Sequence, residues 1–309
     1  MSNCLFCYQK LEDTSGYHDR CCKKFFGTKN LPELHLDKTI LNELAIKTVN
    51  KRIAVTGVQP KLSMDLQKEI GSLRLTLVGL WGQFILKPQH EEFPFMPETE
   101  DLTMHLADLF KIKTCEHALI PTRDGNLAYI TKRYDREKGK KIHVEDLCQI
   151  SGFLTEQKYK GSYEKVGELV SHYCTNKGLD TLNFFELVLF CYLTGNNDMH
   201  LKNFSLIHNR DQTVSLSPAY DLLNVNLVFP DDPDELALTL NGRKRRITKL
   251  DFDTFASRLN LAEKAISNSY AKFTSGSEKV EKVIQSSFLP EDLKIRYQEI
   301  WNSKVKILK

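Results

Sequence analysis

One stretch of the chain, residues 182–194, is apolar on almost every side when it is drawn as a helix. A helix without a polar face has to be surrounded by other elements, so we expect it at the centre of a folded unit. The polar stretch NNDMHLKN, residues 196–203, follows it directly. The sequence therefore predicts a buried helix that ends in a rigid polar loop.

Strand patterns dominate the chain before this helix. Residues 73–77 place leucine at every second position, as a half-buried strand does. Residues 83–87 predict a short strand that ends in Lys87, because Pro88 cannot continue a hydrogen-bond ladder. The stretch LAYITKRYDR, residues 127–136, predicts another strand that runs into charged residues.

Helices are predicted around these strands and through the rest of the chain. Residues 31–50 carry leucine and isoleucine near one face. Residues 99–110 begin with Thr99, a good N-cap, and continue with a leucine-rich stripe. From residue 143 onward the pattern is helical, except for a small hairpin formed by NFSLIHN and VSLSPAYDLL. The expected fold class is α+β, with a β-rich N-lobe and a helical C-lobe.

Composition and cysteine usage narrow the class of protein. The chain has 309 residues and a net charge of +3, which is too small to argue for nucleic acid by itself. No run reaches the apolar length that a bilayer requires, and the N-terminus lacks the pattern of a signal peptide. The eight cysteines are spread along the chain and, apart from those at the N-terminus, are interpreted as reduced thiols in the cytoplasm. We expect a Cys-rich segment at residues 1–30, the N-lobe at 31–134 and the C-lobe at 135–309.

The N-terminal segment contains a set of soft metal ligands. The spacing C-x2-C-x10-H-x2-C is made by Cys4, Cys7, His18 and Cys21. Such pairs on either side of a turn could bind one Zn²⁺. The alternative is that reduced thiols cap a small hydrophobic knob with Phe25 and Phe26, and the neighbouring Cys22 leaves the ligand count ambiguous.

The polar loop also matches the layout that phosphoryl transfer from ATP requires. The reaction needs a carboxylate to accept the proton of the attacking hydroxyl, oxygen ligands for Mg²⁺ and a cation on the phosphates. Protein kinases place the catalytic Asp and a metal-binding Asn five residues apart, and a second metal-binding Asp follows a hairpin. Asp198, Asn203 and Asp221 follow this order. Lys87 at a strand end and Glu100 at a helix start match the ion pair that directs a lysine towards the phosphates.

Several motifs make the chain resemble the HipA family of toxin serine/threonine kinases, and its short HipT branch, known from three-gene HipBST systems, most of all. The motifs are G-x-Q-x-K at Gly57, Gln59 and Lys61, TEDLTMHLA from Thr99, RYDR at 133–136, H-x-E-D-x-C-Q from His143, D-x-H-x-K-N-F-S from Asp198 and P-x-Y-D-L-L from Pro218. The resemblance runs from about residue 50 to the C-terminus and implies a bilobal, protein-kinase-like fold.

The resemblance also implies roles for individual residues. Asp198 would be the base, Asn203 and Asp221 the Mg²⁺ ligands, and Lys87, paired with Glu100, the phosphate-binding lysine. His200 would hydrogen-bond to phosphate or only shape the loop, and Lys202 is a candidate cation for the γ-phosphate. The ATP phosphates would be covered by the loop of Val55, Thr56, Gly57, Val58 and Gln59 with Lys61, and adenine would meet Lys132, Arg133 and Tyr134. Thr56 is the candidate for autophosphorylation, because a phosphate there would add about −2 charge beside the ATP phosphates.

The same resemblance suggests partners and a substrate. A HipB-like antitoxin and a separate HipS-like small protein are implied, with DNA contacted only through the antitoxin. The protein substrate would be an aminoacyl-tRNA synthetase, with the tryptophanyl enzyme favoured, and its phosphorylation would inhibit translation and growth.

Two other functions fit parts of the sequence. A small-molecule kinase of the aminoglycoside type shares the Asp-x4-Asn spacing of the loop. A non-catalytic module that binds nucleic acid or the antitoxin could use the basic run NGRKRRITK, residues 241–249, although such a run is more often a solvated loop.

Overall fold

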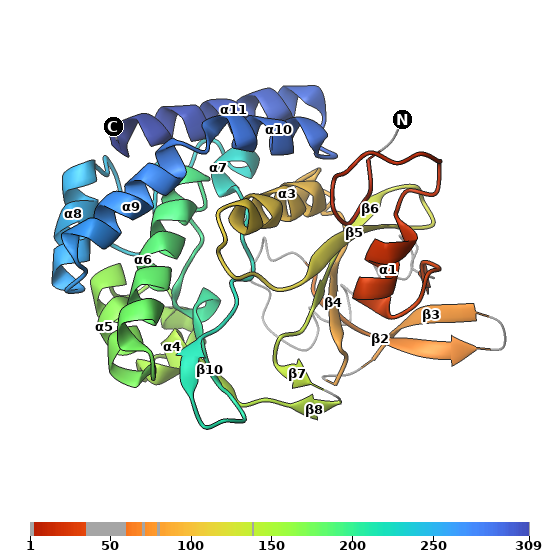
Figure 1. Cartoon of the computed structure of the whole chain (residues 1–309), viewed down its shortest axis with the longest axis horizontal. Helices are drawn as coiled ribbons and strands as arrows, with labels where there is room; N and C mark the ends of the chain where they lie inside the picture. Colours follow the sequence, from red (N-terminus) through yellow and green to blue (C-terminus); the bar gives the residue numbers. More distant parts are fainter. Residues whose placement is uncertain (1–2, 35–59, 70–71, 79–80, 138, 309) are drawn as a thin grey trace. The chain divides into compact units, whose positions relative to one another are not determined.

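The computed structural model describes residues 3–34, 60–69, 72–78, 81–137 and 139–308, and these residues group into two compact units (Figure 1). The first unit comprises Met1–Asp101, Glu116–Arg133 and Ser286–Phe288. The second unit comprises Leu102–Cys115, Tyr134–Gln285 and Leu289–Lys309. None of the helices in the described residues is long and apolar enough to cross a membrane.

A mixed sheet forms the centre of the first unit, and its strands run in the order β1-β3-β2-β4-β6-β5. The strands are β1 (Glu33–Leu34), β2 (Leu62–Glu69), β3 (Ser72–Leu77), β4 (Phe84–Lys87), β5 (His117–Pro121) and β6 (Leu127–Lys132). The pair β1–β3 is parallel and the other neighbours are antiparallel. Alternating residues of β4 and β6 face a buried apolar cluster, which explains why the leucine and isoleucine patterns of these segments form strands.

The N-terminal segment packs on one part of this sheet. Its helix α1 (Asp19–Phe26) ends at Gly27, whose φ of 77° suits a residue without a Cβ. Phe25 and Phe26 of α1 pack against Phe84 of β4, with ring centroids 5.8 Å and 5.5 Å away. The Leu119 N–H of β5 donates to the Leu5 carbonyl at 3.1 Å. Residues 3–34 therefore belong to the same hydrophobic core as the sheet.

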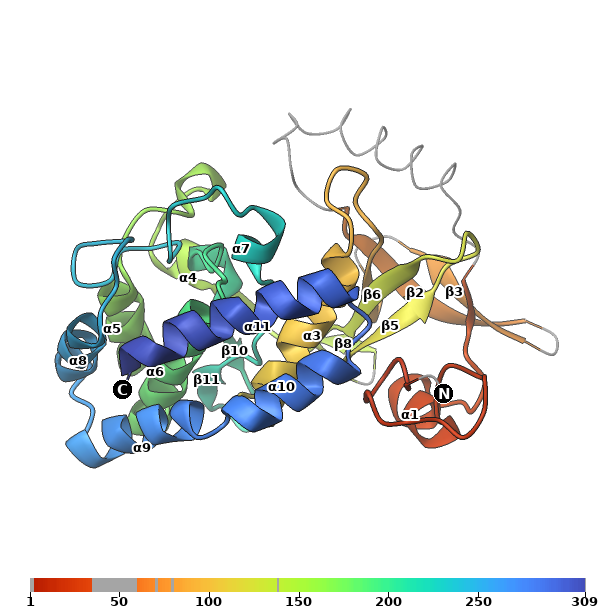
Figure 2. The ribbon, with the colours of Figure 1, turned by 90° about the horizontal axis from the view of Figure 1, so that it is seen from above.

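The second unit is built around α6 (Lys177–Leu193), in which every residue from 187 to 193 is buried. The unit also contains α5 (Tyr163–Tyr173), α8 (Lys249–Arg258), α9 (Glu263–Thr274), α10 (Ser277–Ser286) and α11 (Glu291–Val305), and α5, α8, α9 and α11 contact α6. In Figure 2, α6 lies between α11 and α9, and both of these helices pack on it. The predicted buried helix is thus confirmed, because neighbours enclose its apolar surface.

A small antiparallel sheet of order β11-β10-β9 lies beside α6. It is made of β9 (Val144–Asp146), β10 (Ser205–His208) and β11 (Val214–Leu216), and β9 leads directly into the short helix α4 (Leu147–Ile150). The other short elements are β7 (Arg136–Glu137), β8 (Lys140–Lys141), α7 (Val225–Val228) and the 3-10 turns η1 (Thr155–Gln157), η2 (Leu201–Asn203) and η3 (Lys306–Leu308). The α+β fold, with a strand-rich first unit and a helical second unit, agrees with the sequence prediction.

Three predicted element boundaries were wrong. The helix expected from Thr99 is α3 (Met96–Leu109), and Thr99 lies inside it with its hydroxyl donating to the Phe95 carbonyl at 2.7 Å. Residues 144–146, expected to be helical, form β9 because they pair with β10. Residues 33–34, expected to be helical, form β1 because they pair with β3, and the rest of that predicted helix, from residue 35, lies outside the described residues.

Candidate active site

The C-terminal end of α6 fixes the start of the polar loop. The Thr194 hydroxyl donates to the Phe190 carbonyl at 2.9 Å, which closes the last turn. Gly195 follows with a φ of 67°, and a Cβ at this position would lie 2.8 Å from the Asn224 side-chain oxygen. Both the backbone angle and the lack of space therefore require glycine here.

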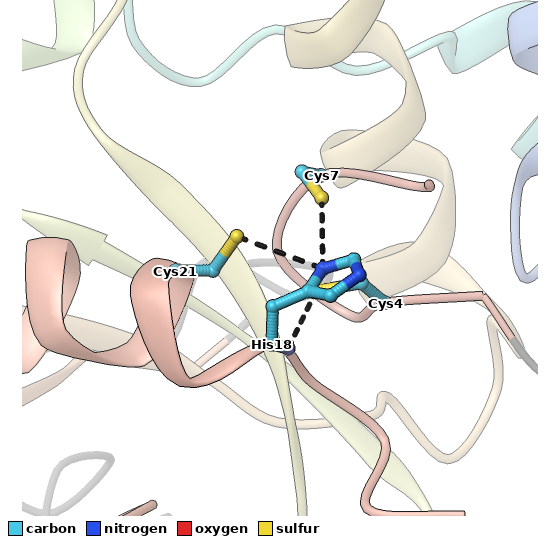
Figure 3. A group of neighbouring side chains, drawn as sticks. All are labelled: Cys4, Cys7, His18 and Cys21. Atoms are coloured by element: carbon cyan, nitrogen blue, oxygen red, sulfur yellow. Dashed lines mark hydrogen bonds between the residues drawn. The ribbon is translucent and has the colours of Figure 1, made fainter. Parts of the chain in front are cut away.

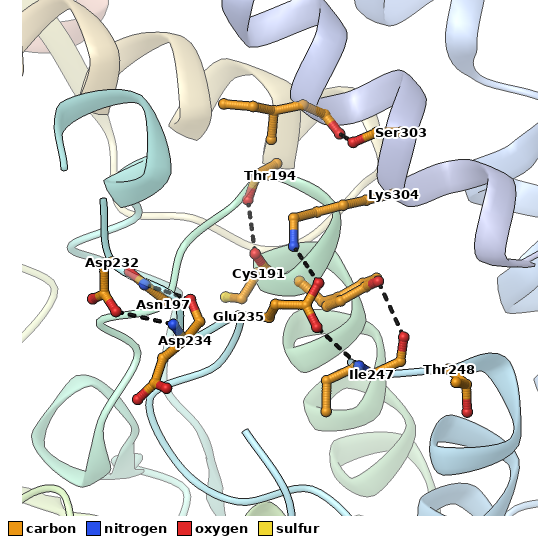
Figure 4. Close-up of polar contacts among 12 residues, drawn as sticks. Cys191, Thr194, Asn197, Asp232, Asp234, Glu235, Ile247, Thr248, Ser303 and Lys304 are labelled. Carbon is orange, nitrogen blue, oxygen red and sulfur yellow. Dashed lines mark hydrogen bonds and ion pairs between the residues drawn. The ribbon is translucent and has the colours of Figure 1, made fainter. Parts of the chain in front are cut away.

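A segment that follows α7 in the chain supports the loop from one side (Figure 4). The Asn197 amide donates to the Asp234 carbonyl at 2.7 Å. Glu235 accepts hydrogen bonds from Lys304 at 3.3 Å and from the Ile247 N–H at 2.8 Å. Burial lowers the pKa of Lys304, whereas the Glu235 carboxylate acts in the opposite direction. These contacts tie the loop to α11 and to residues 234–247.

Asp198 has its backbone fixed and its carboxylate partly open to solvent. Its N–H donates to the Asn196 side chain at 3.2 Å. Its carbonyl accepts from the Asn203 amide at 3.1 Å, so the carbonyl oxygen of that amide is the Asn203 atom left for a cation. The Tyr159 hydroxyl donates to the Asp198 carboxylate at 2.5 Å. This carboxylate is thus oriented to accept a hydrogen bond from a hydroxyl.

His200 is buried within the loop. Desolvation lowers its pKa to about 4, while Asp198 acts in the opposite direction. Within the part of the chain that the structure describes, its Nδ1 has no hydrogen-bond partner. The Tyr159 ring packs edge-on against the imidazole with centroids 4.9 Å apart. At neutral pH the imidazole is therefore uncharged, and it can act as a hydrogen-bonding group but not as a cation.

Lys202 forms an ion pair within the second unit. Its ammonium lies 3.0 Å from the Asp146 carboxylate. Asp146 also caps α4, because its side chain accepts from the Gln149 N–H at 2.9 Å and the Gln149 side chain bonds back to the Asp146 N–H. The pair therefore joins the polar loop to the N-terminus of α4.

Asp221 is brought towards the loop by the hairpin of β10 and β11. The Tyr220 hydroxyl donates to the Lys202 carbonyl at 2.8 Å and contacts the Ser205 hydroxyl at 2.6 Å. The Tyr220 ring stacks on Tyr134 with centroids 5.5 Å apart. Asp221 has a φ of 55°, a left-handed conformation that Asp tolerates better than most residues and that clusters at functional sites.

In the first unit, Lys87 and Glu100 form the ion pair predicted from the sequence. The Lys87 ammonium lies 2.5 Å from the Glu100 carboxylate, and both side chains are at most 5% exposed. The ammonium also lies 5.4 Å from the centre of the Tyr129 ring. Nearby, burial raises the pKa of Glu98 to about 7, although its carboxylate accepts hydrogen bonds from Gln89. β4 and α3 thus present a rigid, buried lysine.

Of the other residues predicted to contact the nucleotide, only some lie in the part of the chain that the structure describes. The phosphate loop of Val55, Thr56, Gly57, Val58 and Gln59, with the candidate phosphorylation site, lies outside the described residues. Lys61 is exposed just before β2. The Lys132 and Arg133 N–H groups donate to the Glu116 and Gln83 carbonyls at 2.9 Å each, and the Lys132 ammonium pairs with the Glu116 side chain at 3.0 Å.

Two residues beside the loop were not among the predicted site residues. Tyr159 lies in a polar stretch whose sequence gives no sign of a contact with Asp198, thirty-nine residues later. Asp146 belongs to the motif H-x-E-D-x-C-Q that begins at His143, and its pairing with Lys202 follows from the register of β9 and β10. Two arginines of the basic run face acids of their own unit: Arg245 lies 2.6 Å from Asp234, and Arg243 lies 3.6 Å from Asp251.

Comparison with known proteins shows to which family and to which kinases the sequence is similar. The HipA-like C-terminal domain matches residues 53–281. The inferred kinase Y4dM of Sinorhizobium fredii is 31% identical over 230 residues, which are 70% of this chain but only 56% of that protein. An inferred kinase of Haemophilus influenzae is 27% identical over 92% of this chain and 90% of its own length. The serine/threonine-protein kinase toxin HipA of Shewanella oneidensis is 26% identical over 62% of this chain and 47% of its own length.

Solved structures agree on the fold. HipA in the HipA, HipB and operator DNA complex of Shewanella oneidensis superposes with a TM-score of 0.67 at 22% identity, over 85% of this chain and 70% of that one. The proinflammatory kinase CtkA of Helicobacter pylori gives a TM-score of 0.54 at 14% identity, over 80% of this chain and 94% of that one. The architecture described above is therefore the kinase-like α+β fold of these proteins.

Proposed function

The chain belongs to the family of the HipA-like C-terminal domain, and on that premise we propose that it is a serine/threonine protein kinase. It uses ATP and Mg²⁺ and transfers the γ-phosphate to a hydroxyl group of a protein. One observation carries the proposal: in the loop after α6, the Asp198 carboxylate accepts a hydrogen bond from a hydroxyl while Asn203 is fixed on the Asp198 carbonyl.

The loop supplies the base and the metal ligands. The oxygen of the acceptor hydroxyl bonds to the γ-phosphorus, and the bond from that phosphorus to the bridging β-phosphate oxygen breaks. Asp198 accepts the proton that the hydroxyl loses. The Tyr159 hydroxyl donates to the Asp198 carboxylate, so in the proposed reaction it has to give way to the acceptor hydroxyl. The Asn203 carbonyl oxygen and the Asp221 carboxylate are hard oxygen ligands, which suit Mg²⁺.

The first unit supplies the phosphate-binding lysine. Lys87 contacts the phosphates of the nucleotide, and Glu100 sets the direction of its ammonium, which matches their pairing at 2.5 Å. On the family pattern, the loop of residues 55–59, which lies outside the described residues, would cover the phosphates, and residues 132–134 would line the adenine. These assignments follow the family pattern.

The other polar residues of the loop position it. His200 is neutral at physiological pH because burial lowers its pKa to about 4, so it contributes hydrogen bonding and shape. Lys202 is part of the loop, and its ammonium is paired with the Asp146 carboxylate. A direct role at the γ-phosphate would require Lys202 to leave that carboxylate.

We place the kinase in a toxin–antitoxin system of the short HipT type. Two similarities support this placement. One relative is named a serine/threonine-protein kinase toxin, and a similar solved structure is a complex of HipA with HipB and operator DNA. The partners are then a HipB-like antitoxin and a HipS-like small protein, and the substrate is an aminoacyl-tRNA synthetase, with the tryptophanyl enzyme as first candidate. Phosphorylation of Thr56 would silence the kinase by placing negative charge beside the ATP phosphates.

The direct test is the intact mass of the protein after incubation with Mg-ATP, together with transfer to aminoacyl-tRNA synthetases. Asp198→Asn and Asp221→Asn should each lower phosphate incorporation at least about a hundredfold, because they remove the base and a metal ligand. Asp211→Asn is the matched control: Asp211 caps the turn of the same hairpin by accepting from the Thr213 hydroxyl at 2.6 Å, and it should keep full activity. Full activity in both site variants would refute the proposal.

The same assay addresses the alternatives. Phosphate transfer to small hydroxylated compounds and to no protein would favour a small-molecule kinase. For direct nucleic-acid binding, the basic run offers less free charge than its sequence suggests, because Arg243 and Arg245 face carboxylates of their own unit.

A further inference from the structure

The three cysteines and one histidine of the N-terminal motif converge on one point (Figure 3). The ligand atoms of Cys4, Cys7, His18 and Cys21 all lie within 4.8 Å of one another. The Cys7 sulfur is 3.6 Å from His18 Nδ1, and the Cys21 sulfur is 3.9 Å from the same atom. These residues come from a turn at 4–7 and from the start of α1, so the fold gathers them across ten intervening residues.

The separations match a tetrahedral metal centre. Zinc–sulfur bonds of about 2.3 Å and zinc–nitrogen bonds of about 2.05 Å at tetrahedral angles put sulfur and nitrogen about 3.6 Å apart. The same bond lengths put two sulfurs about 3.8 Å apart. The two sulfur–nitrogen distances at His18 lie within about 0.3 Å of that geometry.

A second observation concerns the orientation of the His18 ring. Its Nε2 lies 3.2 Å from the Lys10 carbonyl, which can only accept, so this nitrogen carries the proton. In the neutral ring Nδ1 then carries a lone pair, and it is the atom that faces the sulfurs of Cys7 and Cys21. A backbone carbonyl that fixes the tautomer of a histidine in this way is the usual outer partner of a metal-bound imidazole.

Cys22 clarifies the ligand count that the sequence left ambiguous. Cys22 is fully buried in the hydrophobic cluster that also contains Phe25 and Phe26, and it is not a member of the converging group. The group therefore has three sulfurs and one nitrogen. Four protein ligands leave no open position, which is the arrangement of a structural zinc site and not of a catalytic one.

We propose that Cys4, Cys7, His18 and Cys21 bind one structural Zn²⁺, which holds residues 3–27 in the shape that packs on the sheet of the first unit. The segment has one short helix of its own, so a metal that joins its turn to α1 substitutes for a larger core. The shape matters for the Lys87–Glu100 pair, because Phe25 and Phe26 pack on Phe84 of β4 and the Tyr8 hydroxyl donates to Asp101, next to Glu100 on α3.

The test begins with the metal content of the full chain, purified under reducing conditions without chelator. We expect about one zinc per chain, and in the cobalt-substituted protein the visible absorption bands of a tetrahedral thiolate site. Cys21→Ser should weaken binding by more than about 100-fold, beyond what loss of an outer partner costs. Cys22→Ser is the matched control, since it changes the adjacent cysteine without touching the ligand set, and it should keep the metal and the cobalt spectrum.

Three outcomes would overturn the proposal: no stoichiometric zinc and no cobalt spectrum in the native chain, equal retention in Cys21→Ser and Cys22→Ser, or disulfides among these thiols in the reduced preparation. The native measurement decides the question even if Cys21→Ser fails to fold. The kinase-inactive Asp198→Asn variant should bind zinc normally, so the result does not depend on the proposed function.

Discussion

At the residue scale, the polar loop contains two groups with opposite environments only two positions apart. Asp198 keeps its carboxylate partly exposed and in contact with a hydroxyl, whereas His200 is buried. The charged residues that face His200 are Asp198 and Asp221, which favour its protonated form, and Lys158, which opposes it. Desolvation exceeds these effects, so the imidazole stays neutral.

This burial predicts a specific loss of stability in acid. The pKa of His200 is lowered from 6.5 to about 4, so between these values the unfolded chain binds more protons than the folded one. Stability is then fully present above about pH 6.5 and falls as the pH is lowered towards 4, by up to about 3 kcal/mol. Urea unfolding of the nucleotide-free protein across this range, compared between wild type and His200→Asn, should show a flatter profile in the variant.

The exposed His172 provides the control for that experiment. His172→Asn should leave the pH profile of the wild type unchanged. If His200→Asn and His172→Asn gave the same profile as wild type, burial of His200 would have no thermodynamic consequence and the assignment would fail.

Sequence patterns can indicate candidate site residues whose relation is local. Asp198 and Asn203 lie within one loop, so their spacing alone indicates that they can act together. Tyr159 could not be predicted in the same way, because its contact with Asp198 depends on how α4, η1 and the loop pack, and no local pattern records that. The identity of Cys22 as a packing residue also required the fold, since its neighbour Cys21 has the same chemistry.

At the element scale, the Lys87–Glu100 ion pair joins β4 to α3, and both residues were identified from local sequence patterns. Lys87 was predicted at a strand end and Glu100 on a helix, and both placements are confirmed. The helix starts three residues earlier than Thr99 suggests, because tertiary contacts of Met96 and Glu98, both buried, continue it backwards. A good N-cap residue is only a weak prior against such packing.

The same pair allows the structural and chemical roles of Lys87 to be separated. Glu100→Gln or Lys87→Met alone leaves one buried charge without its partner and should cost about 3–5 kcal/mol of unfolding free energy. The double variant removes both charges, so its loss should be smaller than the sum of the single losses. The double variant should nevertheless incorporate no phosphate, because the phosphates of ATP would lack the Lys87 cation.

Urea midpoints of the four proteins give the coupling energy, and intact mass after Mg-ATP gives the activity. A stable double variant with normal phosphorylation would show that Lys87 serves only the fold. Additive single losses would show instead that the two side chains are not coupled.

At the scale of the whole molecule, the chain passes between its two units several times. The boundaries fall after Asp101, Cys115, Arg133, Gln285 and Phe288. α3 is continuous across the first of these boundaries, so one helix belongs to both units. Each unit is therefore assembled from segments that lie far apart in the sequence.

The most distant of these segments is Ser286–Phe288, which begins at the last residue of α10 and precedes α11. There the Ser286 carbonyl accepts from the Asn3 amide at 2.8 Å, and the Phe288 ring meets Tyr8 edge-on at 5.5 Å. A residue near the C-terminus thus stabilises the segment that carries the proposed zinc ligands. An aromatic pair of this kind contributes about 0.5–1.5 kcal/mol beyond the area it buries.

Phe288→Ala should therefore loosen the N-terminal segment selectively. Hydrogen exchange of residues 3–27 should become faster by roughly tenfold, corresponding to about 1–2 kcal/mol of local stability, while α6 keeps its protection. Ile295→Ala is the control, because Ile295 on α11 is 51% exposed and should change neither region. Unchanged exchange of residues 3–27, or equal acceleration in α6, would contradict the dependence of this segment on a contact made nearly three hundred residues later.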